Sequence, residues 1–172
     1  MASPVIRPST PDDADSVTAL LRRNRAFLQP WEPAHEESWY TPAAQRRELA
    51  RLRAEREAGR AAAFLVLDGE EPVGQLTLDT IRREPHQSAE IRVWVSQDRG
   101  NKGLASAAVE AARAEAFGTL GLHRLDAAVL PHNMVAQHLL LATGFVRLGR
   151  APRHQRINGR WQDHMLFQLL AD

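Results

Sequence analysis

The sequence predicts an α/β fold built on one mixed, mostly antiparallel sheet flanked by helices, and three patterns support this prediction. Apolar runs in the middle of the chain predict three strands, at residues 62–68, 72–81 and 88–96. Only the turn sequence GEE separates the first two, which favours a hairpin. A helix, a strand, a helix and a final strand pair follow. A hairpin-rich sheet followed by one β-α-β unit is typical of a mixed sheet rather than of a doubly wound parallel sheet.

Two helices are predicted between a short first strand at residues 4–8 and this strand cluster. Each begins with a threonine N-cap followed by proline at the first helical position, at Thr10–Pro11 and at Thr41–Pro42. Gly59 is a plausible end for the second helix, whose thin apolar stripe predicts a largely solvated surface. Residues 24–40 between them are aromatic and interrupted by proline, so we expect irregular or briefly helical structure.

The strand at residues 88–96 alternates and is followed by the second half of the fold. Ala89, Ile91, Val93 and Val95 share one face, and Glu90, Arg92 and Trp94 share the other. The later elements are expected as a helix over 104–117, a strand over 123–130, a helix from Asn133 to 143 ended by Gly144, and strands over 145–150 and 161–170. The predicted order is therefore β-α-α-β-β-β-α-β-α-β-β.

Length and composition limit the class of protein. A chain of 172 residues is most simply one domain, spanning residues 1–172. Its 22 basic and 21 acidic side chains nearly cancel, so the charge gives no support for a nucleic-acid or membrane partner. The chain has no cysteine, no signal-peptide pattern at its start and no apolar stretch near the ~20 residues that a membrane-spanning helix needs. We expect a soluble, cytoplasmic protein that is a monomer or a homodimer.

A polar loop between the strand at 88–96 and the following helix has the features of an anion site. Backbone N–H groups converge where such a loop enters a helix. Gly103 lets a phosphate approach the main chain, Asn101 tolerates left-handed geometry, and Lys102 adds positive charge. The spacing fits neither a P-loop nor a dinucleotide fingerprint. The alternative is an ordinary glycine-rich turn before a well-capped helix.

In its wider context this loop resembles the pyrophosphate motif of the Gcn5-related N-acetyltransferases (GNAT), and within them the RimJ/RimL-type protein N-acetyltransferases. Gly103, Leu104 and Ala105 fill the second half of that motif, R/Q-x-x-G-x-G/A, whereas Gly100 occupies its first position and Arg99 lies one residue earlier. Similarity extends over most of the chain, through residues 23–33, the block with Pro131, Asn133, Gly144 and Phe145, and residues 157–170.

The resemblance implies a sheet with a V-shaped splay that binds acetyl-CoA as co-substrate, and direct transfer of the acetyl group to an amine. It implies an oxyanion contact from a main-chain N–H near Val93–Val95. The expected coenzyme-binding residues are Val93, Trp94, Val95, Arg99, Gly100, Asn101, Lys102, Gly103, Leu104, Ala105 and Asn133. Asn133 is equally well explained as a helix N-cap, and the two roles are compatible.

Glu90 is the predicted catalytic base, because it lies on the strand expected to contact the coenzyme. The alternatives are a simple Glu90–Arg92 ion pair with a water chain as base, or His132 or His138. The proton donor for the leaving thiolate is harder to assign. Family members often have tyrosine or serine at the positions of Leu140 and Ala136, and neither of these residues donates a proton.

The remaining polar and aromatic residues have less specific predictions. Trp31, Trp39 and Tyr40 are expected to line the acceptor site, or else to pack two helices on the sheet. The final strand pair is expected to use Trp161, Asp163 and His164 in its own packing and hydrogen bonding, and no metal site is expected because His164 has no second ligand at metal spacing.

The predicted function is an acetyl-CoA-dependent N-acetyltransferase that acts on a protein N-terminal α-amine, by resemblance that of a ribosomal protein. One alternative is an enzyme of the same fold that acetylates a small amine, such as an antibiotic or a polyamine. Two others are a non-catalytic acyl-CoA-binding module and an interaction protein without a ligand.

Overall fold

A seven-stranded sheet in the order β1-β2-β3-β4-β5-β7-β6 runs through the computed structural model, which describes residues 5–100 and 102–171. Neighbouring strands are antiparallel except β4 and β5, which are parallel. The predicted fold class and element order are therefore confirmed. The strands are β1 (Ile6–Pro8), β2 (Ala62–Asp68), β3 (Glu71–Arg82), β4 (Ser88–Val95), β5 (Arg124–Val129), β6 (Val146–Ile157) and β7 (Arg160–Leu170).

The first predicted helix begins with a short 3-10 turn at Pro11–Asp13 and becomes α-helical at Ala14, and the later helices begin where the sequence predicts them. The Thr41 hydroxyl accepts a hydrogen bond from the Ala44 N–H at 3.3 Å and caps the second helix, and Gly59 follows its end with φ +70°. None of the helices in the described chain is long and apolar enough to cross a membrane. The four α-helices of the described residues are α1 (Ala14–Leu28), α2 (Pro42–Glu57), α3 (Leu104–Ala114) and α4 (Met134–Ala142), with short turns η1 (Pro11–Asp13), η2 (Glu37–Tyr40), η3 (Gln97–Arg99) and η4 (Glu115–Thr119).

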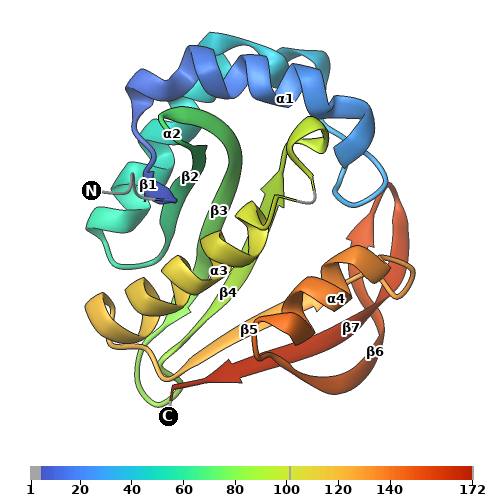
Figure 1. The fold of residues 1–172 in the computed structure, drawn as a ribbon. Helices are drawn as coiled ribbons and strands as arrows, with labels where there is room; N and C mark the ends of the chain where they lie inside the picture. The colour runs from blue at the N-terminus through green and yellow to red at the C-terminus, as the bar shows by residue number, and fades with distance from the viewer. Residues whose placement is uncertain (1–4, 101, 172) are drawn as a thin grey trace.

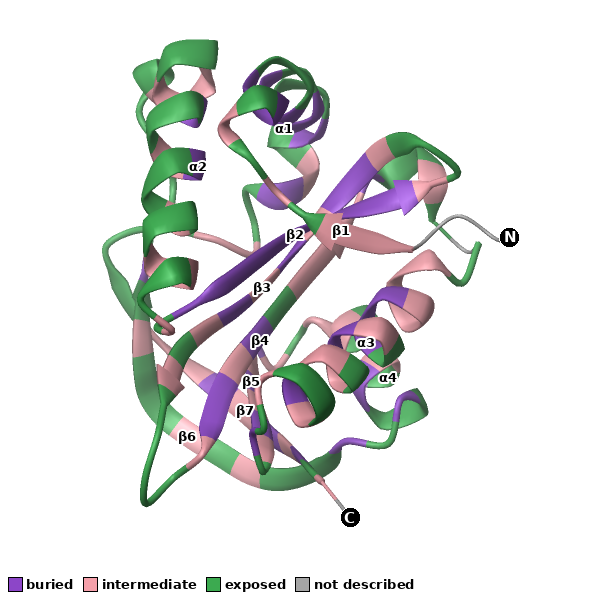
Figure 2. Ribbon diagram, turned by 90° about the vertical axis from the view of Figure 1, so that its left-hand side faces the viewer, coloured by how far each residue is buried: buried purple, intermediate pink, exposed green. Residues whose placement is uncertain are grey.

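Helices cover the sheet from both sides, with α1 and α2 on one face and α3 and α4 on the other (Figure 2). The alternation within each strand divides the core accordingly. Phe64 and Val66 of β2 belong to the apolar cluster that contains α3, whereas Leu65 and Leu67 belong to the cluster that contains α1. The predicted alternation of β4 is confirmed, because Ala89, Ile91, Val93 and Val95 join the first cluster and Trp94 joins the second.

Strand β6 is longer than the predicted 145–150, because it continues through an irregularity. Its pairing with β7 shifts register between Ala151 and Gln155, where Arg153 has φ +48°. The strand then resumes and reaches a tight turn at Asn158 and Gly159, whose φ angles of +50° and +79° fit a type I′ hairpin.

The parallel pair β4–β5 separates soon after it begins. Only three residue pairs join the two strands, the last of them Glu90 with Asp126. Beyond that point β4 stays with β3 as far as Val95, and β5 stays with β7 as far as Val129. The two arms of the sheet diverge, as Figure 1 shows between the yellow-green and orange strands. The predicted V-shaped splay is thus present.

Candidate active site

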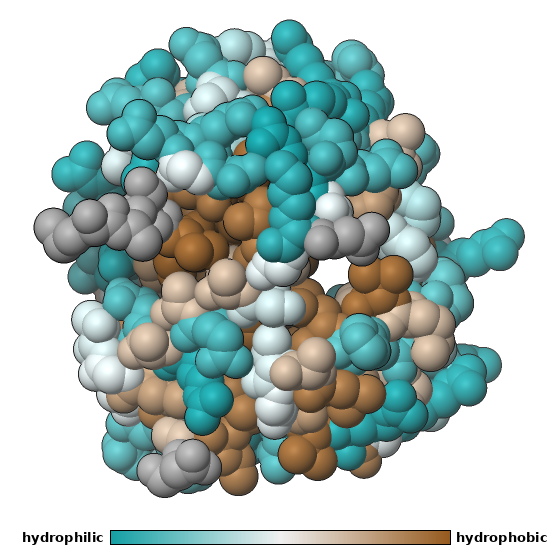
Figure 3. Space-filling view, viewed as in Figure 1, coloured by the Kyte–Doolittle hydropathy of each residue, from teal (hydrophilic) through white to brown (hydrophobic). Residues whose placement is uncertain are grey.

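The open end of the splay is bordered by two free strand edges and two helix N-termini. Helix α3 follows the end of β4 and helix α4 follows the end of β5, so both helices begin at the open end of the splay (Figure 1). Figure 3 shows the surface hollowed between the region over β4 and the region over α4. Helix N-termini attract anions because their first N–H groups have no partner within the helix.

Gly103 begins helix α3 in a left-handed conformation, with φ +72° and ψ +4°. That conformation favours glycine, and a Cβ at this position would have no atom within 4 Å. The main chain at Gly103 therefore has free space on the side where a Cβ would stand. Gly100 ends the short turn η3 before it, and the predicted site residue Asn101 lies outside the described residues.

Arg99 and Lys102 are engaged with the acidic turn between β2 and β3. The Arg99 guanidinium is 2.7 Å from Asp68 and 2.7 Å from Glu71, and the Lys102 ammonium is 3.4 Å from Asp68. The hydrogen bond from Arg99 holds the pKa of Asp68 below its usual range, and Lys102 adds to the effect. In this structure Arg99 anchors the loop to the hairpin, a role that no sequence pattern predicts.

Asn133 and helix α4 form the opposite border of the splay. The Asn133 Oδ1 atom accepts the Ala136 N–H at 3.1 Å, so the residue does cap the helix. Its Nδ2 atom has no partner among the described residues. Leu140, at the position where family members often have a tyrosine, is buried in the core. His138 on the same helix is exposed, so no buried histidine replaces the tyrosine hydroxyl there.

Glu90 is the last residue of β4 that pairs with β5, and it lies on the sheet face that carries α1 and α2. Its carboxylate is 3.6 Å from the Arg92 guanidinium, and both side chains are partly accessible. The β4 residues Val93, Trp94 and Val95 follow, and all three are half-buried. Because pairing with β5 has ended, the free edge of β4 lies beside the residue predicted to be the base.

Glu32 is a second carboxylate near Arg92, and it was not among the predicted site residues. Burial raises the pKa of Glu32, and the charge of Arg92 partly opposes the rise. The signal available in the sequence was its position after Trp31 in a proline-broken aromatic stretch. A carboxyl group whose pKa lies above its usual value is better matched to accepting a proton near neutral pH.

The segment of residues 29–36, here called the bridging segment, joins the two arms of the splay. It leaves the end of α1 on one arm. On the other arm, the rings of Trp31 and His132 lie 5.4 Å apart, and the Ala34 N–H donates to Asn158 Oδ1 at 2.8 Å. The open end of the splay is therefore crossed by chain on the side of α1 and α2.

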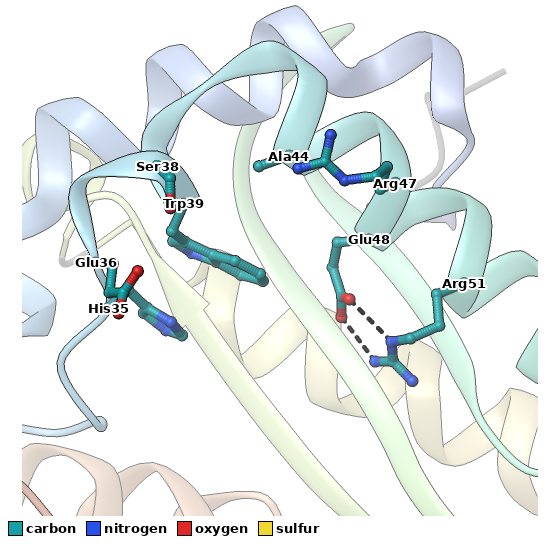
Figure 4. A pocket seen from close by; sticks show the side chains of 8 residues that line it. All are labelled: His35, Glu36, Ser38, Trp39, Ala44, Arg47, Glu48 and Arg51. Carbon is teal, nitrogen blue, oxygen red and sulfur yellow. Dashed lines mark hydrogen bonds and ion pairs between the residues drawn. The ribbon is translucent and has the colours of Figure 1, made fainter.

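A cavity of about 430 Å³ lies between η2 and α2 (Figure 4). His35 and Trp39, stacked with ring centroids 4.4 Å apart, form one wall, and the Glu48–Arg51 ion pair forms the other (Figure 4). The hydrogen bonds that Arg51 donates to the Glu48 carboxylate raise the pKa of Arg51, and the charge of Asp79, which pairs in register with Glu90, adds to this. The cavity therefore has one aromatic wall and one charged wall.

The three predicted acceptor-site aromatics divide into two groups. Trp31 contacts His132 across the open end of the splay, and Trp39 lines the cavity. Tyr40 instead packs against the apolar cluster of α1, with the Arg25 guanidinium 4.3 Å from its ring centroid. The position of Tyr40 therefore agrees with the alternative prediction, that these aromatic residues pack helices on the sheet.

The final strand pair has the hydrogen bonds expected of it. Asp163 accepts from the Arg150 side chain at 2.8 Å and from the Arg153 N–H at 2.9 Å. His164 is buried beside the ring of His154, whereas Trp161 is 63% exposed. Within residues 5–100 and 102–171, no group of three or more His, Cys, Asp or Glu side chains is arranged to hold a metal ion.

Comparison with known proteins agrees with this geometry. The family model described as "Acetyltransferase (GNAT) domain" matches residues 5–146. The [ribosomal protein uS5]-alanine N-acetyltransferase of Escherichia coli is 30% identical over 159 residues, which cover 91% of this chain and 82% of that protein.

Two solved structures are similar over nearly the whole chain. The ribosomal-protein-S5-alanine acetyltransferase of Vibrio fischeri superposes with a TM-score of 0.92 and 30% identity, covering 97% of this chain and 92% of that one. The Mycobacterium smegmatis RimJ in complex with CoA-disulfide gives a TM-score of 0.92 and 30% identity, covering 96% and 81%.

Proposed function

Because this chain belongs to the GNAT family of acetyltransferases, we propose that it acetylates the N-terminal α-amine of a protein in the cytoplasm, a ribosomal protein in the first instance. Acetyl-CoA is the acetyl donor. The observation that carries the proposal is the splay of β4 from β5, which leaves a strand edge free beside two helix N-termini. The names of the E. coli and V. fischeri proteins, both alanine N-acetyltransferases of a ribosomal protein, support the choice of acceptor.

The coenzyme is assigned to the side of the splay that carries α3 and α4. Its pyrophosphate would bind the N–H groups of Gly103, Leu104 and Ala105, beginning where Gly103 leaves free space beside the main chain. The pantetheine would follow the free edge of β4 at Val93–Val95. The unpartnered Nδ2 atom of Asn133 is available to the coenzyme from the opposite border.

The acceptor is assigned to the opposite face, beneath the bridging segment. Its amine nitrogen attacks the thioester carbonyl carbon, the N–C bond forms and the C–S bond breaks, and main-chain N–H groups near Val93–Val95 would stabilise the oxyanion. Two carboxylates near Arg92 are candidates to take the ammonium proton. Glu90 lies on the strand assigned to the thioester, and the pKa of Glu32 is raised by burial. Because Ala136 and Leu140 donate no proton, water would protonate the thiolate.

The test compares acceptors directly. The protein is mixed with acetyl-CoA and one acceptor at a time. The acceptors are peptides beginning in Ala, Ser or Met, the same peptides blocked at the N-terminus but containing an internal lysine, a polyamine and an aminoglycoside. Thiol release gives the rate, and mass spectrometry locates the acetyl group. Transfer to the free N-terminus of peptides is the expected result. Faster transfer to a small amine would assign the chain to the alternative acceptor class.

A further inference from the structure

Asn24 of helix α1 is buried and bonded to the loop that follows β4. Its side chain is 2% exposed, and Nδ2 donates both to the Leu20 carbonyl at 2.9 Å, within the helix, and to the Ser96 hydroxyl at 2.9 Å. Its Oδ1 atom accepts the Gln97 N–H at 2.9 Å. The Ser96 hydroxyl in turn donates to Asp98 at 2.5 Å. The Asn24 side chain therefore forms hydrogen bonds with two groups, the Ser96 hydroxyl and the Gln97 N–H, of a loop far from it in the sequence.

These bonds fix the first residues of the segment that leads to Gly103. The later part of the same segment is fixed separately, by Arg99 on Asp68 and Glu71. The loop is thus attached on one side to α1 and on the other to the β2–β3 turn. A loop already held in its binding conformation loses less entropy when a ligand binds, and its affinity for that ligand is higher.

We propose that Asn24 is a positioning residue for acetyl-CoA, holding Ser96 and Gln97 so that the N–H groups at the start of α3 face the coenzyme pyrophosphate. The proposal rests on the coenzyme placement proposed above. It also links the two substrates, because helix α1 carries Asn24 and continues into the bridging segment assigned to the acceptor side. Asn24 itself contacts neither substrate in this arrangement and acts through the loop.

The direct test is the affinity for CoA, measured by calorimetry on the full chain. Asn24→Leu keeps the volume of the side chain and removes its hydrogen bonds. We expect the dissociation constant for CoA and the KM for acetyl-CoA to rise about 10- to 100-fold, as loss of the two hydrogen bonds to Ser96 and Gln97 implies. The kcat at saturating acetyl-CoA should change by less than about 3-fold, because the reacting groups stay in place.

Thr18→Val is the matched control. Thr18 lies on the same helix, is equally buried at 2% exposure, and among the described residues its hydroxyl bonds only to the Ala14 carbonyl, at 2.6 Å. The variant removes a buried hydrogen bond from α1 without touching the loop, so CoA affinity should not change. Ser96→Ala keeps the Gln97–Asn24 bond and should give a smaller loss of affinity than Asn24→Leu. It also serves as the test if Asn24→Leu does not fold.

Gly103→Glu separates failure of this proposal from failure of the coenzyme placement. It introduces a carboxylate, in a strained left-handed backbone, where the pyrophosphate is assigned. Unchanged CoA affinity in Gly103→Glu overturns the placement and the role of Asn24 together. The other outcome is that Gly103→Glu loses CoA affinity while Asn24→Leu and Ser96→Ala bind CoA as well as Thr18→Val does. That result overturns the role of Asn24 alone.

Discussion

The rings of Trp31 and His132 lie 5.4 Å apart and connect segments that belong to different arms of the splayed sheet. Trp31 follows the last turn of α1, and His132 precedes α4. Together with the Ala34–Asn158 hydrogen bond, this contact holds the bridging segment in position across the open end. The side proposed to bind the acceptor is therefore built from residues that are far apart in the sequence.

Trp31→Ala should weaken acceptor binding while leaving coenzyme binding intact. Removing the ring eliminates the contact with His132 and loosens the bridging segment, so we expect the KM for an acceptor peptide to rise about tenfold. Steady-state kinetics and CoA calorimetry measure the two effects separately. His132→Ala should reproduce part of the loss. An equal rise in the CoA dissociation constant would contradict the assignment of Trp31 to the acceptor side.

Glu32→Gln and Glu90→Gln should differ in their pH profiles. Burial raises the pKa of Glu32, so its ionised form, the form able to accept a proton, appears at higher pH than for an ordinary glutamate. In the wild type, kcat/KM should increase as the pH rises through that pKa. We expect Glu32→Gln to lose this dependence and about 10²- to 10⁴-fold of the rate, and Glu90→Gln to retain the dependence. The reverse pattern would assign the base to Glu90, as the sequence predicts.

Asp13→Asn should destabilise the fold in a pH-dependent way. Arg7 donates to the Asp13 carboxylate at 2.6 and 3.0 Å and, with a further bond from the Thr10 N–H, holds the pKa of Asp13 below its usual value. A lowered pKa stabilises the folded state above the unfolded-state pKa, and this contribution is lost as the pH falls through the folded-state pKa. We expect a loss of about 1–3 kcal/mol near neutral pH.

Denaturant unfolding of Asp13→Asn at several pH values measures this effect, and Asp12→Asn is the control. The Asp12 side chain is 95% exposed and 3.7 Å from Arg46, so its substitution should change the free energy of unfolding by less than about 0.5 kcal/mol. A destabilisation by Asp13→Asn that persisted unchanged at acidic pH would show that the ion pair is not its source.

Gly74→Ala should affect both stability and coenzyme binding. A Cβ on Gly74 would collide with the Trp94 carbonyl oxygen and lie 3.0 Å from the Val95 Cα. Both atoms belong to the backbone at the end of β4, so the strand must shift, at a cost of about 1–3 kcal/mol. Thermal unfolding and CoA calorimetry detect the two consequences. Gly118→Ala is the control, because a Cβ there meets nothing within 4 Å.

The sequence predicted those parts of the fold that depend on local patterns. The alternation of β4 placed Trp94 and Val93 on opposite faces, and Thr41 marked a helix start, because both features follow from a few consecutive residues. The extent of β6 was underestimated, since its continuation past Ala151 depends on a bulge paired with another strand.

The unpredicted parts of the candidate site depend on long-range contacts. The burial of Glu32 arises when the bridging segment folds over the sheet, and the partners of Arg99 lie on a turn formed much earlier in the chain. Asn24 stands in the sequence where the first predicted helix meets the segment expected to be irregular or briefly helical, and no motif marks it. The motif marks the loop proposed to bind the coenzyme, but it carries no information about what supports that loop.

The early end of the β4–β5 pairing also has a consequence for the protein in solution. Besides its outer edges at β1 and β6, the described sheet has two inner edges, along β4 after Glu90 and along β5 after Asp126. Unpaired strand edges are where extended segments of other chains add and aggregation begins. A coenzyme lying along β4 would occupy one of them, so the protein should remain dispersed longer in concentrated solution with CoA than without it. The affinity for CoA and the resistance to aggregation would then both depend on the free edge of β4.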